Sequence, residues 1–206
     1  QPRRQEEAEV EARIAALQAR IQPHFLFNSM NTIASLIASD PERAEEVVLD
    51  LCDLFRVSLN TAGTRLIPLS EELRLCERYL AIEKLRLGPR LDVDWHLDDS
   101  ASELPVPPLI LQPLMENAVY HGIQPLTGGG TIRVESERTR RWLYILIHNP
   151  LASDQAGRHQ GQRMALENIR ARLQAVYGDT AALKASQGND HFTVTLRLPG
   201  NRENEA

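Results

Sequence analysis

The sequence has little of what marks membrane-spanning, secreted or nucleic-acid-binding proteins. It contains no run of roughly 18 or more apolar residues, so we expect no transmembrane helix within these 206 residues. No signal peptide is recognisable at the N-terminus. Basic residues do not dominate, because 23 Lys and Arg stand against 28 Asp and Glu, a net charge of −5. We therefore expect no direct contact with nucleic acid.

Cysteines are also scarce. The two that occur, Cys52 and Cys76, lack the spacing of a metal site, and both fall within expected helices. We interpret them as reduced, small core residues, which suits a reducing compartment. Hydrophobic residues make up 42% of the chain, enough to bury a real core in one large or two small domains.

The N-terminal part of the chain is patterned as two long helices. Residues 5–39 have apolar positions three and four apart, interrupted at Pro23, where we expect a kink. Asp40 and Pro41 form a helix start with Asp40 as the N-cap, and the second helix runs to about Asn60. The chain opens in helical pattern without a methionine, so we expect either a piece of a longer protein or a helix that continues upstream. Two such helices make half of a four-helix bundle, which we expect a second copy to complete.

His24 lies on the apolar seam of the first expected helix. It follows Ile21 by three residues, and Asn28 lies four residues further along the same seam. A polar patch beside a kink breaks the local pattern, as functional sites often do. A single histidine on such a seam is more commonly a core or interface residue, and His24 alone favours that interpretation.

From about Leu66 onward the chain mixes helices with short strands. Apolar periodicity predicts helices at 71–87, 109–121 and 162–177. Alternation and turn signals predict strands at 91–97, 131–137, 142–149, 183–186 and 192–198. Ser70 is expected to cap the first of these helices. The predicted fold class is α+β, with helices on one face of a mixed sheet. We place the domain boundary between residues 1–64 and 65–206.

A second group of polar residues lies on the expected helix 109–121. Glu116 and Asn117 are adjacent, and His121 shares a helix face with Asn117 because it follows four residues later. Hard oxygen ligands of this kind suit Mg²⁺, which takes a few protein oxygens together with waters and phosphates. The alternative is an ordinary helix end, with Gly122 as the residue after the C-cap.

Four segments resemble motifs of the LytS-type sensor histidine kinases, and they occur in that family's order. The phospho-acceptor box of the family is similar to LQARIQPHFLFNSMNTI, and its N box to PLILQPLMENAVYHG. The glycine-rich G box corresponds to GQRMALENIRARLQAVYG, and the closing strand to FTVTLRLP. Within the family, the chain resembles the FimS and AlgZ sensors, which work with an AlgR-type response regulator.

The resemblance implies a fold and a set of roles. Residues 1–64 would be a dimerisation and phosphotransfer hairpin, forming a four-helix bundle in the homodimer. Residues 65–206 would be an α/β sandwich of the Bergerat, or GHKL, type that binds ATP with Mg²⁺. His24 would accept the γ-phosphoryl group, with Asn28 one turn on to hold its other ring nitrogen.

The same resemblance assigns the nucleotide site. Glu116 would act as, or near, the general base, and Asn117 would ligate Mg²⁺. The other nucleotide-binding positions implied are His121, Gly122, His148, Asn149, Gly161, Arg163, Leu166 and Asn168.

The chain departs from the family pattern at three places, one of which is Tyr120, where family members often carry a basic residue facing the phosphates. His148, Asn149 and Pro150 stand where the family has an Asp-Asn-Gly run whose aspartate reads adenine. Replacing that charged acceptor by His148 removes a hydrogen bond of roughly 1.5–3 kcal/mol. Arg163 and Ala165 occupy positions where glycines would let phosphate approach the backbone. We therefore predict weak, Mg²⁺-dependent ATP binding.

Three functions fit these features. The first is the kinase region of a two-component sensor, which phosphorylates itself on His24 and passes the group to an aspartate on the receiver domain of a LytTR-type response regulator. Its expected location is the cytoplasmic side of a bacterial inner membrane, with membrane contact only through a segment upstream. The second is a degenerate pseudokinase or phosphatase scaffold, and the third a purely structural module with His24 in its core.

Overall fold

Helices α2 (Pro23–Ser39) and α3 (Pro41–Asn60) form an antiparallel hairpin joined through the single residue Asp40. The carboxylate of Asp40 accepts the backbone N–H of Arg43 at 3.1 Å, which confirms the predicted N-cap. The computed structural model describes residues 23–60, 65–151 and 159–200. The residues before Pro23, on which the predicted kink depends, lie outside these ranges.

The hairpin has a buried seam and an exposed apolar side. The side chains buried along α3 are three and four residues apart: Ala44, Val47, Leu51 and Leu54. That spacing is the one expected of a helix that packs along one face. The large apolar side chains left exposed are Phe27, Met30, Ile37, Val48 and Leu49. Cys52 is also exposed, so its interpretation as a core residue was wrong, whereas Cys76 is buried as predicted.

The second compact unit, residues 64–206, is built on a five-stranded mixed sheet. Its strands are β2 (Leu91–His96), β4 (Gly130–Arg138), β5 (Trp142–Pro150), β6 (Ala182–Gln187) and β7 (His191–Pro199). They lie in the order β2-β4-β5-β7-β6, with β2 parallel to β4 and the other pairs antiparallel. This unit is an α+β fold, in agreement with the prediction from sequence.

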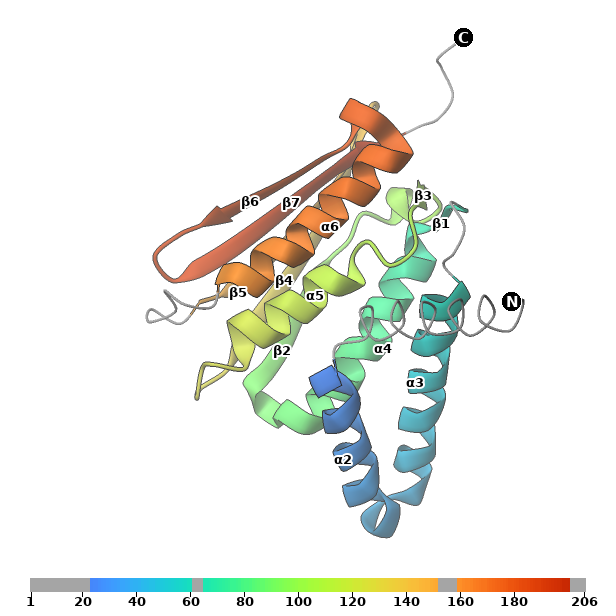
Figure 1. The fold of residues 1–206 in the computed structure, drawn as a ribbon, viewed down its shortest axis with the longest axis vertical. Coiled ribbons are helices and arrows are strands. Elements are labelled where there is room, and N and C mark those ends of the chain that lie inside the picture. The colour runs from blue at the N-terminus through green and yellow to red at the C-terminus, as the bar shows by residue number, and fades with distance from the viewer. Residues whose placement is uncertain (1–22, 61–64, 152–158, 201–206) are drawn as a thin grey trace, which may run out of the picture. The chain divides into compact units, whose positions relative to one another are not determined.

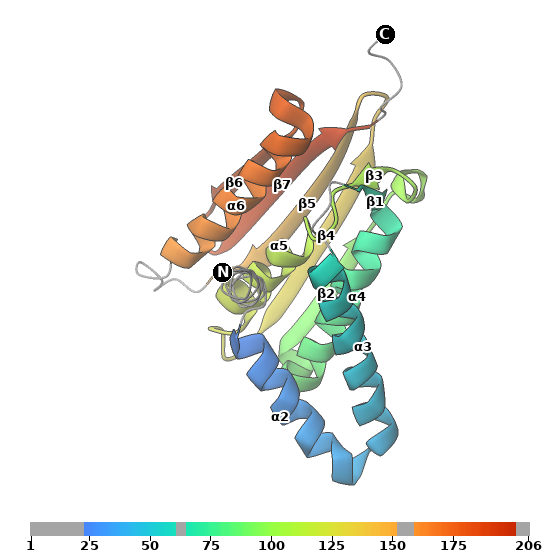
Figure 2. The same cartoon turned by 45° about the vertical axis from the view of Figure 1, so that its right-hand side comes forward.

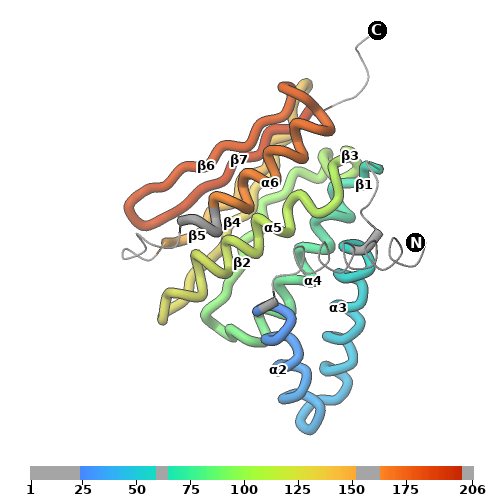
Figure 3. The backbone as a smooth tube through the Cα atoms, in the orientation of Figure 1, coloured from blue at the N-terminus to red at the C-terminus, as the bar shows by residue number. Residues whose placement is uncertain are grey.

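Three helices cover one face of that sheet (Figures 1 and 2). They are α4 (Leu69–Leu87), α5 (Gln112–Asn117) and α6 (His159–Tyr177). Helix α5 lies between α4 and α6, as the backbone trace also shows (Figure 3). Along β5 the residues Leu143, Ile145 and Ile147 point to this helix-covered face and are buried. The intervening residues point to the opposite, open face, because side chains alternate along a strand.

All three predicted helices of this unit start at other residues than expected, and α6 begins at His159 instead of residue 162. Helix α4 begins at Leu69, with Pro68 rather than Ser70 as its N-cap. The helix expected from 109 begins only at Gln112, and from Ala118 to Ile123 it widens into a π-helical turn. A small additional sheet pairs β1 (Ile67–Pro68) with β3 (Pro105–Val106). In the described ranges, every helix is too short or too polar to cross a bilayer.

Candidate functional site

Helix α5 carries Glu116 and Asn117, both more than nine-tenths buried. The helix is short, and its hydrogen-bond pattern changes directly after Asn117, where the π-helical turn begins. The N–H of Gln124 bonds the carbonyl of Val119, five residues back, at 2.9 Å. Such wide turns inside helices occur frequently at functional sites. Here the wide turn joins the Glu116-Asn117 pair to the segment that meets strand β5.

Glu116 has one hydrogen bond within α5 and lies close enough to Glu83 of α4 to feel its charge. Its carboxylate accepts the side-chain N–H of Gln112 at 3.1 Å. Burial raises the pKa of Glu116 to about 7; the hydrogen bond from Gln112 opposes this rise and the charge of Glu83 adds to it. A carboxyl group with that pKa exchanges its proton near neutral pH, the range in which a general base is most effective.

Asn117 has an amide group that fits a bound phosphate and its metal ion. The amide nitrogen is buried and has no hydrogen-bond partner within the described protein. Buried polar groups are nearly always paired, so an unpaired one points to a missing ligand. A phosphate oxygen would accept from this nitrogen, and the amide oxygen is a ligand that Mg²⁺ takes. No three His, Cys, Asp or Glu side chains of the described ranges gather as a metal site, so the ion would need phosphate oxygens and waters.

The π-helical turn brings Gly122 against the end of strand β5. An atom added at the Cβ position of Gly122 would lie 2.4 Å from Asn149 Nδ2 and 2.9 Å from the carbonyl oxygen of Pro150. Asn149 is 2% exposed, and its amide donates to that same Pro150 oxygen at 2.8 Å. Gly122 and Asn149 therefore meet at the helix-covered face, at the strand end where the family resemblance expects adenine to be read.

His148 points to the opposite face of the sheet from Asn149. Its ring lies on the open face, where Nδ1 is 2.8 Å from Thr193 Oγ1 and the ring centroid is 4.9 Å from that of His191. Burial lowers the pKa of His148, and the charges of His191 and Arg133 add to this. The role of His148 in place of the adenine-reading aspartate stays a prediction, and the neighbouring Asn149 has the inward side chain.

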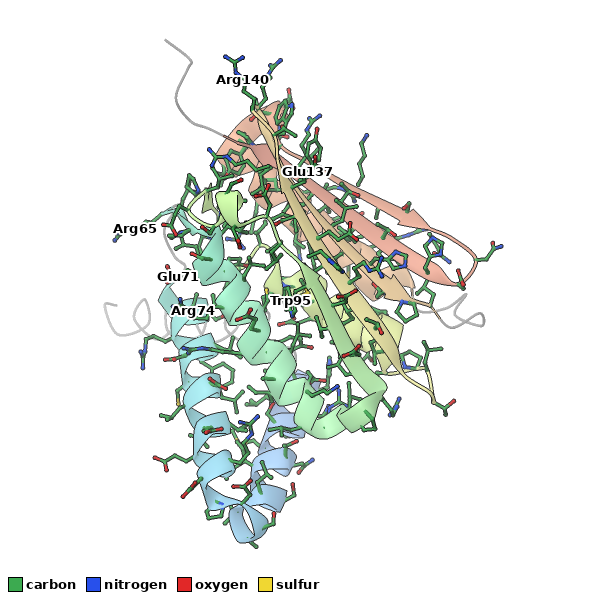
Figure 4. The ribbon with its side chains drawn as sticks, turned by 180° about the vertical axis from the view of Figure 1, so that it is seen from behind. Arg65, Glu71, Arg74, Trp95, Glu137 and Arg140 are labelled. Carbon is green, nitrogen blue, oxygen red and sulfur yellow. The ribbon has the colours of Figure 1, made fainter. Side chains whose placement is uncertain are left out.

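The open face has its own polar lining. Arg133, Glu135, Leu146, His148 and Thr193 surround a pocket there. Figure 4 shows the sheet from behind and labels Glu137 of β4 and Arg140 of the turn between β4 and β5. The guanidinium of Arg197 lies 4.4 Å from the centre of the Trp142 ring, a cation–π contact.

The residues of the glycine-rich box are helical. Gly161, Arg163, Leu166 and Asn168 all lie in α6. Leu166 is buried, whereas Arg163 and Asn168 are exposed on the helix. The box does not form an open glycine loop at these four positions; residues 152–158, which precede α6, lie outside the described ranges. His121 is buried in the π-helical turn with its ring edge-on to Tyr120.

His24 and Asn28 belong to the other compact unit. Both lie on α2, one turn apart, and both are half-buried. Four hydroxyl side chains follow along α2 and bond carbonyls three or four residues back: Ser29, Thr32, Ser35 and Ser39.

Several residues of the site were not found from sequence. Gln112 bonds Glu116, and Glu72 and Glu83 lie on the buried side of α4. The sequence contains a signal for Glu72 and Glu83. Together with Cys76 and Tyr79 they form one helical seam, in which successive residues are four, three and four positions apart. A carboxylate on an apolar seam is rarely buried without a partner, and that rule would have singled them out.

Known proteins match this chain in sequence and in fold. Residues 12–91 match the family model described as Histidine kinase. Sensor protein LytS of Staphylococcus haemolyticus is 33% identical over 200 residues, covering 92% of this chain and 34% of that protein. Sensor histidine kinase/phosphatase LytS of Staphylococcus aureus is 31% identical over 207 residues, covering 95% of this chain and 35% of that protein. The chain thus spans about a third of the length of these relatives.

A solved structure of a bacterial phosphotransferase shares the fold. It is 12% identical and has a TM-score of 0.52, covering 90% of this chain and 95% of that chain. At this identity the likeness concerns the fold alone.

Proposed function

Because this chain belongs to the LytS-type histidine kinase family, we propose that it is the kinase region of a sensor that transfers the γ-phosphoryl group of ATP to His24. The observation that carries the proposal is the buried, unpaired amide of Asn117 beside the wide turn that seats Gly122 on Asn149. The amide of Asn117 can bind phosphate, and the amide of Asn149 lies where adenine is expected. Both suit a nucleotide bound across α5 and β5.

Separate side chains of this protein bind the nucleotide, accept the phosphoryl group and accept the proton. Asn149 hydrogen-bonds the adenine edge, and Asn117 holds the phosphates through its amide. Mg²⁺, when bound with the nucleotide, neutralises phosphate charge during transfer. A ring nitrogen of His24 forms a bond to the γ-phosphorus as the bond from that phosphorus to the bridging oxygen breaks. ADP leaves, and the proton that the imidazole loses goes to the carboxylate of Glu116.

The partners follow from the family. A second copy packs on the exposed apolar side of the α2–α3 hairpin, and the phosphoryl group passes from His24 to an aspartate of a response regulator of the LytTR type. The chain would act on the cytoplasmic side of a bacterial membrane.

The test is labelling with γ-³²P-ATP and Mg²⁺. Wild type should acquire label that acid removes and base does not, as expected of phosphohistidine. His24→Gln should lose it because the acceptor is gone, and Asn117→Ala because phosphate and metal are no longer held. Asn31→Ala, an exposed asparagine on the same helix as His24, is the matched control and should keep the label. Label that persists in His24→Gln would contradict the assignment of the acceptor.

A second function is favoured by the neutral adenine contact and the helical glycine-rich box. Asn149 offers an uncharged acceptor, and the exposed Arg163 occupies a position of close phosphate approach. A scaffold or phosphatase with weak ATP binding would fit these two features. Its signature is a protein that binds ATP, acquires no label, and accelerates loss of phosphate from the regulator's aspartate.

A further inference from the structure

The turn that leads into α5 contains a strained residue. Leu109 has φ of +55°, and it is the one non-glycine residue with positive φ in the described ranges. A branched side chain is disfavoured in this left-handed conformation, at a cost of roughly 1–3 kcal/mol. Such a residue persists only where its surroundings hold it in place. Two helices provide these surroundings.

Glu72 of α4 holds the amide side of the turn. One carboxylate oxygen accepts the N–H of Leu109 at 2.7 Å. The other accepts the N–H of Leu111 at 2.8 Å and that of Gln112 at 3.4 Å. Glu72 is completely buried; burial raises the pKa of its carboxyl, and these backbone N–H groups oppose the rise. Both oxygens act as acceptors at the start of α5, the helix end that favours negative charge.

Arg172 of α6 holds the carbonyl side of the same turn. One guanidinium nitrogen donates to the carbonyl of Leu109 at 2.9 Å, and the other to that of Pro108 at 2.6 Å. The N–H of Leu109 is thus bonded from α4 and its C=O from α6. The two helices flank α5 in Figures 1 and 3.

We propose that Glu72 and Arg172 are positioning residues of the kinase, which act through the strained Leu109 turn to fix α5 and thereby the amide of Asn117. Asn117 is only five residues beyond Gln112 on this short helix, and Gln112 itself bonds Glu116. A loosened turn would therefore displace both polar groups of the site. This inference rests on the proposed function, because Asn117 is the residue that it positions.

Glu72 and Arg172, with their hydrogen bonds to the Leu109 turn, are called the clamp below. Two conservative variants test these two residues separately. Glu72→Gln keeps the size of the side chain but turns an NH₂ group toward a backbone N–H. Arg172→Lys keeps the charge but cannot donate to two carbonyls in one fork. The matched controls are Glu71→Gln, exposed on α4, and Arg170→Lys, whose guanidinium reaches Leu183 instead.

Two readouts separate positioning from general stability. One is Mg²⁺-dependent ATP binding compared with adenosine binding by calorimetry. The other is amide hydrogen exchange of residues 111–118, followed in the protein without nucleotide. We expect each clamp variant to weaken Mg²⁺–ATP binding roughly tenfold, the loss of one charge-assisted hydrogen bond, and adenosine binding less than about threefold. The rate of amide hydrogen exchange in residues 111–118 should rise in both clamp variants and in neither control.

A double variant tests the role of strain. Glycine adopts positive φ without steric cost, so Leu109→Gly removes the need to hold the turn. Introduced into Glu72→Gln, it should restore part of the lost Mg²⁺–ATP affinity. A further loss instead of recovery would contradict the proposed mechanism.

The possible failures are distinguishable. If wild type binds Mg²⁺–ATP and the clamp variants match their controls in both readouts, the inference is wrong and the kinase proposal stands. If adenosine and Mg²⁺–ATP binding fall equally, the clamp merely supports the fold, and the inference is again wrong. If wild type binds no Mg²⁺–ATP, the proposed function itself fails and the inference falls with it.

Discussion

Gly122 lies directly against the side chain of Asn149, and no larger residue fits between them. The nearest approach, 2.4 Å from an added Cβ to Asn149 Nδ2, is far inside van der Waals contact. The π-helical turn and the end of β5 are therefore held at a separation that only glycine permits.

Gly122→Ala should separate these two elements and weaken ATP binding. We expect a loss of affinity of roughly tenfold or more and a stability cost of about 1–3 kcal/mol from overpacking. Calorimetry and thermal unfolding measure the two effects. Gly128→Ala is the control, because nothing lies within 4 Å of its added methyl group. Equal affinities in the two variants would contradict the close packing described.

The two faces of β5 predict opposite results at neighbouring residues. Asn149→Ala should weaken ATP binding roughly 3- to 10-fold, because one neutral hydrogen bond to adenine is lost. His148→Ala should leave the affinity within about twofold, since its side chain contacts Thr193 and His191 on the open face. Titration with ATP measures both, and the reverse order would restore His148 as the adenine contact.

The raised pKa of Glu116 predicts a pH-dependent stability. Between its usual value of 4.5 and about 7, the folded protein keeps this carboxyl protonated while the unfolded chain ionises it. This contribution is full below pH 4.5 and is lost as pH rises through about 7, a change of about 3 kcal/mol. Glu116→Gln remains neutral, so its stability relative to wild type should increase between pH 5 and pH 8. Urea unfolding at pH 5 and at pH 8 tests this, with Glu103→Gln, at an exposed position, as the control.

The same pKa predicts how catalysis depends on pH. A base must be ionised, so labelling of His24 should accelerate as pH rises through about 7. In Glu116→Gln the rate should be low and should lack the rise that ionisation of Glu116 produces near pH 7. An unchanged pH profile in that variant would remove Glu116 as the base.

Asp40→Ala should loosen the first turn of α3. Its carboxylate satisfies the N–H of Arg43, and loss of such a cap costs about 1 kcal/mol. Amide exchange at the start of α3 should then become roughly fivefold faster. Ser39→Ala, which removes an exposed hydroxyl from the neighbouring position, should not change exchange there.

The exposed apolar side of the hairpin predicts self-association. Phe27 is 70% exposed and Leu49 59% exposed, and contiguous exposed apolar side chains mark interaction sites. Leu49→Arg should convert a dimer to a monomer in analytical ultracentrifugation, because a buried unpaired charge is costly. Glu45→Arg, an exposed residue of the same helix, is the control for added positive charge.

The fold followed from sequence where one periodicity dominated. The helical seam of α3 and the alternation in β5 both describe side chains that face a single core, so local spacing was sufficient. The start of α5 was missed, because the left-handed Leu109 depends on Glu72 and Arg172, which are distant in sequence. Nothing in the local pattern distinguishes that leucine from one in a helix.

The opposite orientation of His148 and Asn149 has a simpler cause. The motif comparison aligned His148 with an aspartate, but a shift of one residue turns every side chain of a strand to the other face. Leu143, Ile145 and Ile147 already marked the inward positions, and the next in that series is Asn149. Alternation therefore places Asn149, and not His148, on the helix-covered face.

The stacking of Arg197 on Trp142 has a practical consequence for spectroscopy. The chain has two tryptophans and four tyrosines, and all of them lie beyond residue 64. Trp142 lies on the open face, whereas Trp95 pairs in register with the inward Val134 on the helix-covered face. Intrinsic ultraviolet fluorescence therefore reports on the sheet unit alone, with one emitter on each side of it. The hairpin that carries His24 is optically silent, so a single tryptophan placed there would supply an independent signal.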